Sequence, residues 1–313
     1  MAKPIALVMG ANGRCGRSVV TALVNAGWQV RAQARAPIVT AASVTAVVCD
    51  ASDRMAVLAA AQGVELIVHA INPSRYTAAA WRHALPLLDV SIAAALHSGA
   101  LLMMPGNIYN YGRIPPELID RNAPERAETV LGSIRIRMEQ RLAQTPGLNS
   151  AVLTAGDFFG SGAGVWFDQV ITAKWRKDVV QYPGPFDCTR AWTWLPDLAR
   201  ACAAIAERRA GLNGFHKWMM PSYNLTGRQL HQALQAAAGR ALTLRPMPWW
   251  PIGLLSPVAP VMRTLWQMRA SWRHSHALDN QELSRYLGHF TQTPLDQALS
   301  ASLRDLGLLA PGP

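Results

Sequence analysis

The sequence predicts an α/β fold, a doubly wound parallel sheet with a smaller, mostly helical C-terminal substrate lobe. Residues 5–9 are an apolar run typical of a buried parallel strand, and they lead directly into a glycine-rich turn. After the turn, the apolar spacing from Val19 onward indicates a helix that stops at Gly27. Strand and helix patterns then alternate along the first half of the chain, whereas residues 257–306 indicate helices separated by prolines.

The turn has a glycine at every third position, Gly10, Gly13 and Gly16. Glycines here let the turn close, bring backbone N–H groups near a pyrophosphate and let the helix pack on the strand. The helix N-terminus then faces the anion with its positive end. We therefore expect a dinucleotide site of the Rossmann type, with an ordinary strand–helix turn as the alternative. The residues of this turn expected to bind the cofactor are Gly10, Asn12, Gly13, Arg14, Cys15 and Gly16.

The end of the second strand, residues 28–34, indicates which dinucleotide is bound. A fold that prefers NAD places an Asp or Glu here, but this chain has Gln33, Ala34 and Arg35. Arg35, together with Arg14, can bind a 2′-phosphate. We expect NADP as the cofactor, with NAD as the alternative. The competing interpretation is that both arginines are solvated surface residues.

Two further strands should complete the cofactor crevice. Residues 44–49 predict a strand that ends at Asp50 and Ala51, and Asp53 is placed to cap the helix over residues 55–61. The alternative role for Asp50 is that of a plain turn carboxylate.

Residues 64–69 predict the next strand, and the segment after it should pass over the cofactor's ribose. This segment is Ala70, Ile71 and Asn72. His69, at the end of a buried strand, is interpreted as a core histidine with a hydrogen-bond partner.

The remaining pattern sets the expected domain boundaries. The expected elements are a helix over Arg75–Ser98 interrupted at Pro86, a strand over 100–104, a helix over 125–144, a strand over 148–155 and a helix near Asp197, which is placed as its cap. We expect residues 1–160, with 186–210 returning to them, to form the dinucleotide-binding domain. Residues 161–185 and 211–313 should form the substrate lobe.

Composition narrows the classes of partner. The formal charge is +11 over 313 residues, but the basic residues are scattered and match no zinc-finger or helix-turn-helix spacing, so we expect no nucleic-acid partner. Four cysteines without paired spacing, and no secretory pattern, favour free thiols, a cytoplasmic protein and no metal site. The most apolar tract, residues 246–261, contains five prolines, so we expect no membrane span and no membrane partner.

Several motifs resemble those of extended and atypical short-chain dehydrogenases, in particular the NAD(P)-dependent epimerase/dehydratase-like branch. The three-residue glycine spacing resembles their G-x-x-G-x-x-G turn, and Asn107-Ile-Tyr-Asn-Tyr-Gly112 resembles their S-S-x-x-V-Y-G segment. Gly156-Asp-Phe-Phe-Gly160 resembles the stretch that lies along the nicotinamide, and residues 191–199 resemble a later F-x-W-x-H-x-x-D-x-A segment.

The resemblance implies roles for single residues. Asp50 would meet the adenine amino group, Ala155 would lie beside the nicotinamide, and Asn107 would stand where the family has its catalytic Ser or Thr. An Asn amide can bind a substrate carbonyl but cannot relay a proton as a hydroxyl does.

The family's Tyr-x-x-x-Lys pair is absent. The matching helix positions are Leu131 and Arg135, so Arg135 keeps a cation for the nicotinamide ribose while the phenol is lost. Tyr109 and Tyr111 are the nearest phenols and the candidate substitute acids. The alternative is that both rings pack at the domain interface.

Two functional hypotheses follow. The first is an NADP(H)-dependent oxidoreductase or epimerase-like enzyme acting on a carbonyl or secondary alcohol of a small hydrophobic substrate, as a monomer or homodimer. The second is a cofactor-binding regulator similar to the NmrA-type proteins, without turnover. The Trp residues at 249, 250, 266 and 272 would line an apolar pocket, form a subunit face or pack in the core.

Overall fold

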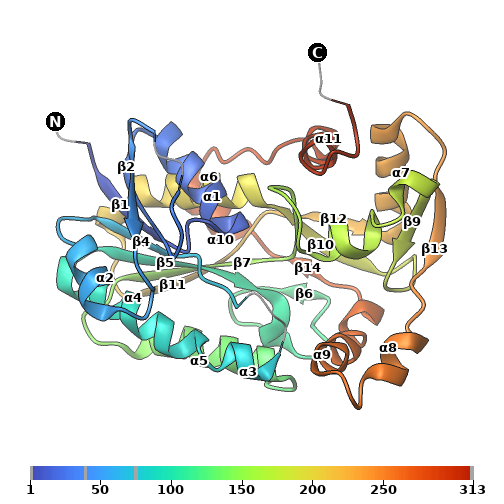
Figure 1. Ribbon diagram of the computed structural model, residues 1–313, viewed down its shortest axis with the longest axis horizontal. Helices are drawn as coiled ribbons and strands as arrows, with labels where there is room; N and C mark the ends of the chain where they lie inside the picture. Colours follow the sequence, from blue (N-terminus) through green and yellow to red (C-terminus); the bar gives the residue numbers. More distant parts are fainter. Residues whose placement is uncertain (1–2, 39–40, 74–76, 311–313) are drawn as a thin grey trace.

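The structure, a computed structural model, describes residues 3–38, 41–73 and 77–310. At its centre is a parallel sheet of seven strands in the order β11-β7-β5-β4-β1-β2-β3 (Figure 1). The chain order reverses between β1 and β4, which is the doubly wound arrangement that the sequence predicts. The strands are β1 (Ile5–Met9), β2 (Gln29–Ala34), β3 (Val44–Val48), β4 (Leu66–His69), β5 (Leu101–Asn107), β7 (Ser150–Ala155) and β11 (Phe215–Met219).

Helices cover both faces of this sheet, which explains why β1 is a continuous apolar run. Its residues Ala6 and Val8 belong to the core on one face, and Leu7 and Met9 belong to the core on the other. In Figure 1 one face is covered by α1 (Arg14–Asn25), α6 (Leu195–Glu207) and α10 (Gln281–Leu287), and the opposite face by α2 (Arg54–Ala60), α4 (Ala84–Ser98) and α5 (Val130–Gln144), with the short α3 (Ala78–Trp81) against α5.

Two local predictions hold at the helix ends. Asp53 caps α2 by accepting from the backbone N–H of Ala56 at 3.0 Å. Gly27, with φ of +86°, follows the end of α1 in the left-handed conformation that favours glycine.

The helix expected over Arg75–Ser98 differs from the prediction. Arg75 and Tyr76 lie outside the described residues, and residues 78–98 contain the two helices α3 and α4, with the break at Arg82 and His83. Pro86 does not cause this break, because it lies in the first turn of α4, where a backbone N–H has no helical acceptor.

The helix expected over residues 125–144 begins later, at Val130. Thr129 caps it by accepting from the backbone N–H of Gly132 at 3.0 Å. The residues before this cap run outside the helix, and among them Glu125 pairs with Lys217 at 2.7 Å.

The second part of the molecule combines short strands with helices beside one end of the sheet (Figure 1). Its core is mainly aromatic, with Phe159, Phe167, Trp175, Trp192 and Trp272 fully buried. Its strands are β6 (Leu118–Ile119), β8 (Asp157–Phe159), β9 (Val179–Tyr182), β10 (Thr189–Trp194), β12 (Tyr223–Thr226), β13 (Thr243–Pro246) and β14 (Ala277–Leu278). Its helices are α7 (Gly227–Ala238), α8 (Trp250–Leu255), α9 (Pro260–Met268) and α11 (Leu295–Asp305), and the short helical turns of the chain are η1 (Ile108–Tyr111), η2 (Phe167–Ile171), η3 (Trp175–Lys177), η4 (Arg209–Gly211) and η5 (Ser271–Arg273).

The boundary between the two parts differs from the expected one. Strand β11 lies in the range 211–313, which is expected to belong to the lobe. It pairs with β7 instead and forms an edge of the large sheet. Helix α10 from the same range packs on that sheet through Leu283 and Leu287. The chain therefore returns to the sheet twice after residue 210, because β11 hydrogen-bonds along β7 and α10 buries its leucines against the sheet.

Asp197 has the expected structural role through a different contact. The first turn of α6 follows Trp194, and Asp197 does not cap it. The buried carboxylate instead accepts from the backbone N–H of Thr293 at 2.9 Å and from its hydroxyl at 2.7 Å. It thereby ties the segment before α11 to α6.

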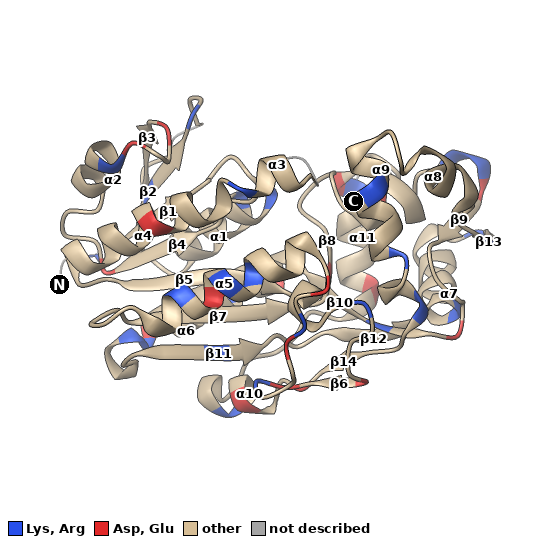
Figure 2. Cartoon of the chain, turned by 90° about the horizontal axis from the view of Figure 1, so that it is seen from below, with Lys and Arg blue, Asp and Glu red and all other residues tan. Residues whose placement is uncertain are grey.

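Lys and Arg are distributed over both parts of the molecule rather than gathered in one stripe (Figure 2). Within the described residues, none of the helices has the length and apolar character that crossing a membrane requires. In the same part of the chain, no three His, Cys, Asp or Glu side chains gather in a way that could hold a metal ion.

Candidate functional site

The glycine turn between β1 and α1 forms a close-packed backbone cradle. A Cβ at Gly16 would lie 2.3 Å from the carbonyl oxygen of Gly10, and Gly10 itself has φ of +77°. A Cβ at Gly10 would lie 3.1 Å from Ile71 Cγ1 and 3.2 Å from the backbone of Ala70. The structure thus brings the glycine turn against the segment after β4, as the sequence predicts, and leaves no room for side chains between them.

The start of α1 fits an anionic group. Its first residue follows Gly13, which has no side chain to cap the helix, and the first turn contains no acidic residue. The first backbone N–H groups of a helix have no acceptor within it, so they are available to a phosphate. Cys15 lies in this turn, and burial raises the pKa of its thiol to about 12, so it is neutral at physiological pH.

Gln33 is a residue whose role the sequence analysis missed. Its side chain is buried, accepts from the backbone N–H of Gly10 at 3.0 Å and donates to the carbonyl of Cys49 at 2.8 Å. One amide therefore ties the glycine turn to the ends of β2 and β3. The signal in the sequence is a lone polar residue in an otherwise apolar strand end, because buried polar groups are almost always hydrogen-bonded.

The two arginines expected to bind a 2′-phosphate are in different situations. The guanidinium of Arg14 donates to the backbone carbonyls of Gly160 and Ser161, across the crevice in the segment after β8. Arg35 is exposed at the end of β2, and its charge helps to lower the pKa of Asp50, whose carboxylate accepts mainly from Ser52. Arg14 therefore joins the turn to the second part of the molecule, whereas Arg35 is the exposed arginine at the strand end expected to meet the 2′-phosphate.

Of the other residues expected at the cofactor, Asn12 is exposed and donates to the carbonyl of Ala36 at 3.3 Å. Ala51 is buried just after β3.

Arg135 lies at the carboxyl ends of β4 and β5, where the ribose site is predicted. Its guanidinium donates to the side-chain oxygen of Asn72 at 2.9 Å and to the carbonyl of Pro105 at 3.4 Å. It also lies 5.2 Å from the centre of the Trp81 ring. Burial of His69, with a smaller contribution from the charge of Arg135, lowers the pKa of that histidine to about 3. His69 is therefore neutral, and its ring is hydrogen-bonded to the Ser91 hydroxyl at 2.8 Å.

Asn107 ends β5 directly beside Ala155 of β7 in the parallel register. Its side-chain oxygen accepts from the backbone N–H of Tyr109 at 3.0 Å and so begins η1. Only the amide NH₂ of Asn107 is left to donate to another group. This agrees with the expectation that Asn107 can orient a group but cannot relay a proton.

Tyr109 and Tyr111 point into different surroundings. Tyr111 is fully buried among Ile108, Met219 and their neighbours, and Lys217 Nζ lies 5.3 Å from the centre of its ring. Burial raises the pKa of Tyr111 to about 12. Tyr111 is thus a packing residue, and the prediction that it is a candidate proton donor is corrected. Tyr109, in contrast, lines a pocket.

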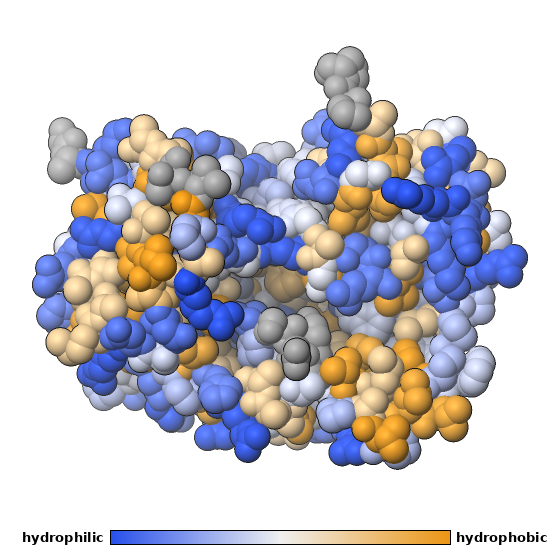
Figure 3. All heavy atoms as spheres, in the orientation of Figure 1, coloured by the Kyte–Doolittle hydropathy of each residue, from blue (hydrophilic) through white to orange (hydrophobic). Residues whose placement is uncertain are grey.

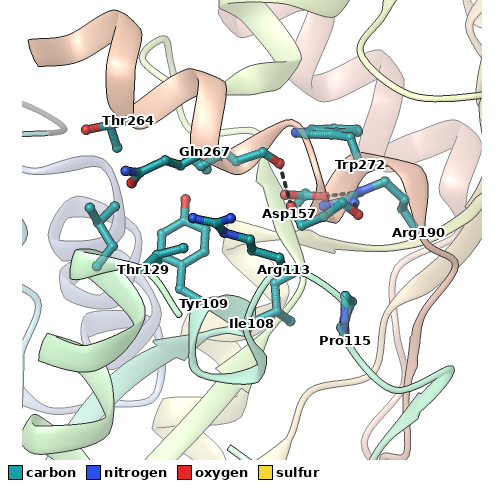
Figure 4. A pocket seen from close by; sticks show the side chains of 14 residues that line it. Ile108, Tyr109, Arg113, Pro115, Thr129, Asp157, Arg190, Thr264, Gln267 and Trp272 are labelled. Atoms are coloured by element: carbon teal, nitrogen blue, oxygen red, sulfur yellow. Dashed lines mark hydrogen bonds and ion pairs between the residues drawn. The ribbon is translucent and has the colours of Figure 1, made fainter. Parts of the chain in front are cut away.

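The pocket with Tyr109 lies between η1, the start of α5 and helix α9. In Figure 4 the Tyr109 ring points toward Thr264 and Gln267 of α9, with Arg113 extending beside it. Leu131, at the position that the resemblance assigns to the family's Tyr, lines the same pocket. The remaining lining residues are Ile108, Gly112, Pro115, Thr129, Asp157, Arg190, Met268, Ser271 and Trp272.

A glycine brings α5 close enough for this arrangement. A Cβ at Gly132 would lie 2.4 Å from the carbonyl oxygen of Tyr109. The α5 backbone therefore contacts η1 directly next to Leu131. In the sequence, the pair Leu131-Gly132 indicates that the start of this helix differs from the Tyr-containing helix of the resembling family.

A buried ion pair forms the far wall of the pocket (Figure 4). Arg190 Nε donates to Asp157 at 2.8 Å, and the guanidinium lies 3.9 Å from the centre of the Trp272 ring. Sequence reasoning missed this pair, because the two residues are 33 positions apart and no local pattern links Asp157 to Arg190.

Comparison with known proteins gives a family match for part of the chain. The model of the NmrA-like family matches residues 2–95, which include the glycine turn and the first four strands. No curated protein matches the chain.

Solved structures match almost the whole chain at low identity. L-threonine dehydrogenase from Clostridium difficile has a TM-score of 0.75 at 15% identity, covering 97% of this chain and 98% of that one. The UDP-Glc/GlcNAc 4-epimerase of Campylobacter jejuni has a TM-score of 0.75 at 13% identity, covering 96% and 98%. UDP-glucose 4-epimerase from Bifidobacterium longum, solved with NAD⁺ and UDP, has a TM-score of 0.72 at 15% identity, covering 96% and 97%. These likenesses confirm the predicted fold, a doubly wound parallel sheet of the Rossmann type.

Proposed function

We propose that the protein is an NADP(H)-dependent oxidoreductase that reduces a carbonyl or oxidises a secondary alcohol of a small substrate. The observation that supports it most is the exchange of positions between Leu131 and Tyr109. The helix position at which the resembling enzymes have their phenol is apolar here, and a phenol from the neighbouring turn lines the same pocket.

The proposed reaction needs few groups from the protein. When bound, the nicotinamide cofactor supplies or accepts the hydride at the carbonyl carbon. The Tyr109 hydroxyl gives its proton to the carbonyl oxygen, so that C=O becomes CH–OH. The amide of Asn107 donates to the same oxygen and orients it. Arg135 holds the ribose with its charge, in place of the family's Lys.

The preference for NADP is supported by the end of β2. Gln33 is engaged with the glycine turn and Cys49, so it is not available to a ribose hydroxyl. Arg35 is exposed at the same strand end, where its guanidinium can bind a phosphate with two parallel hydrogen bonds.

The cofactor preference is tested by fluorescence titration with NADPH and NADH. The wild type should bind NADPH more tightly, and Arg35→Asp should reverse the order, because it removes a cation and restores an acceptor for the ribose. An equally exposed arginine in the other part of the molecule, Arg176, gives the control Arg176→Asp, which should leave both affinities unchanged. Equal binding of both cofactors to the wild type and to Arg35→Asp would contradict the assignment of Arg35.

The proton donor is tested by the pair Tyr109→Phe and Tyr111→Phe in a screen of carbonyl substrates with NADPH. Tyr109→Phe should lower kcat by about 10²-fold or more, the usual contribution of a positioned acid. Tyr111→Phe should leave kcat nearly unchanged, since its hydroxyl lies outside the pocket. Equal rates in both variants would remove Tyr109 from the mechanism.

We propose a cofactor-binding regulator as the second candidate. It is favoured by the absence of the Tyr–Lys pair from α5 and by the match of residues 2–95 to the NmrA-like family. Tight cofactor binding, without turnover of any carbonyl by the wild type, would support this candidate over the enzyme.

A further inference from the structure

Helices α8 and α9 form a hairpin whose outer side is apolar and exposed. Trp250, Leu254 and Val258 are 72%, 72% and 80% exposed. Figure 3 shows hydrophobic side chains gathered over α8 and α9 on the side of the molecule seen there. We call this surface the hairpin face, which consists of Trp250, Leu254, Leu255, Val258, Val261 and Trp266.

The hairpin face is presented by a defined scaffold. A Cβ at Gly253 would lie 2.9 Å from the Trp266 ring, so α8 and α9 pack in direct contact. Arg263 donates to the carbonyls of Ser256 and Pro257, at 3.3 Å and 2.6 Å. These bonds fix the turn between the helices and hold Val258 at its tip. An exposed patch of this kind on an ordered hairpin marks an interaction surface.

The stretch of chain that contains the hairpin carries charge of one sign. Residues 245–273 have no acidic residue and four basic ones, at positions 245, 263, 269 and 273. Arg263 is exposed on α9, Arg245 is exposed just before α8, and Arg269 lies 4.8 Å from the centre of the Trp266 ring. Apolar side chains and tryptophans bordered by arginines match a surface that is apolar within and anionic outside.

We propose that the hairpin face docks on the surface of an anionic lipid bilayer. Amphipathic helices with Trp and Leu on one side and Arg beside them lie in the interface, with the apolar side among the acyl chains. Basic side chains near the surface are attracted by the negative potential of anionic lipids. With 6 and 9 residues, α8 and α9 are too short to span a bilayer, so they bind its surface.

The docking site adjoins the candidate pocket. Val261 and Trp266 of α9 belong to the hairpin face, whereas Thr264, Gln267 and Met268 of the same helix line the pocket. Helix α9 thus separates the pocket from the proposed bilayer. Docking on a bilayer departs from the expectation of no membrane partner, because prolines that exclude a spanning helix do not exclude binding at the bilayer surface. It does not depend on whether the protein turns over a substrate.

The test is co-sedimentation with vesicles of phosphatidylcholine containing phosphatidylserine, compared with phosphatidylcholine alone. The full chain should sediment with the anionic vesicles, and binding should weaken as salt is raised. The double variant Leu254→Glu/Val258→Glu should lower the partition by about tenfold or more, because it places two carboxylates among the acyl chains. Met55, equally exposed on the distant α2, gives the control Met55→Glu, which should bind as the wild type does.

Separate measurements keep the proposal falsifiable. Thermal unfolding and NADPH titration should be the same for the double variant and the wild type, since both residues are exposed. If the double variant does not fold, the single variant Arg245→Glu replaces it, with a smaller expected loss of vesicle binding. Absence of wild-type binding to anionic vesicles at low salt would overturn the proposal. So would a dimer of the wild type in light scattering that the double variant abolishes, since the hairpin face would then be a contact between two copies.

Discussion

The cofactor crevice and the pocket beneath α9 are built in different ways. The crevice consists of backbone at the ends of neighbouring parallel strands, with glycines where two segments touch. The pocket consists of side chains from three separate stretches, 108–131, 157–190 and 264–272. Where backbone segments touch, only small residues fit at the contact positions. Where side chains line a pocket, one side chain can take over the role of another. The proposed replacement of a phenol at the position of Leu131 by Tyr109 would be of the second kind.

The interiors of the two parts of the molecule also differ. The cores on both faces of the sheet are mainly aliphatic, whereas the lobe core is aromatic and adjoins the buried pair of Arg190 and Asp157. Replacing one member of a buried pair leaves the other charge without compensation. Near the pocket, substitutions of buried charged residues should therefore lower stability most. In the crevice, the largest losses should come from substitutions of glycines whose backbone is crowded.

The largest effect on stability is expected from Asp157→Ala. It leaves the guanidinium of Arg190 buried without its carboxylate, and should lower the free energy of unfolding by about 3–5 kcal/mol. The matched control is Asp187→Ala, which breaks the exposed pair with Arg228 and should change stability by less than about 1 kcal/mol. Urea unfolding measures both. Equal losses in the two variants would mean that burial of the pair has no energetic consequence.

The crevice should respond strongly to Gly16→Ala. The added Cβ would meet the carbonyl oxygen of Gly10 and the backbone of Ala11, which cannot move aside as a flexible side chain does. Cofactor binding should fall below detection in the fluorescence titration, and the free energy of unfolding should drop by about 1–3 kcal/mol. Gly211→Ala is the control, because a Cβ there meets no atom within 4 Å. Unchanged NADPH affinity in Gly16→Ala would contradict the assignment of the turn to the cofactor.

At neutral pH the smallest effect is expected from His69, because its protonation changes stability only as the solution is acidified. Burial lowers its pKa from 6.5 to about 3 in the folded protein, so the unfolded chain binds more protons between these values. Stability should therefore fall as the pH drops from about 6.5 toward 3, by up to about 1.4 kcal/mol per pH unit for this group.

The variant His69→Gln should flatten that dependence, and His97→Gln, an exposed residue of α4, should not. Urea unfolding at a series of pH values would show the difference. The buried His276, whose pKa also lies well below its usual value, should contribute with the same sign. Parallel curves for His69→Gln and the wild type would contradict this account of His69.

The sequence by itself determined the sheet, the order of its first strands and the place of the glycine turn. These depend on local patterns: apolar runs, glycine spacing and the Asp53 cap lie within a few residues of the structure they specify. Asn107 and Arg135 were indicated by the resemblance to short-chain dehydrogenases rather than by local chemistry, and they lie at the end of β5 and within α5.

The tertiary structure alone decided the features that join distant segments. It separated Tyr109 from Tyr111, turned Arg14 toward Gly160, and paired Arg190 with Asp157 in the wall of the pocket. It also returned β11 to the edge of the sheet. Such contacts depend on how whole elements pack, and a side chain two positions along a turn can face a pocket or a core. No local pattern distinguishes these outcomes, because their free energies arise from burial and pairing with residues far away in the chain.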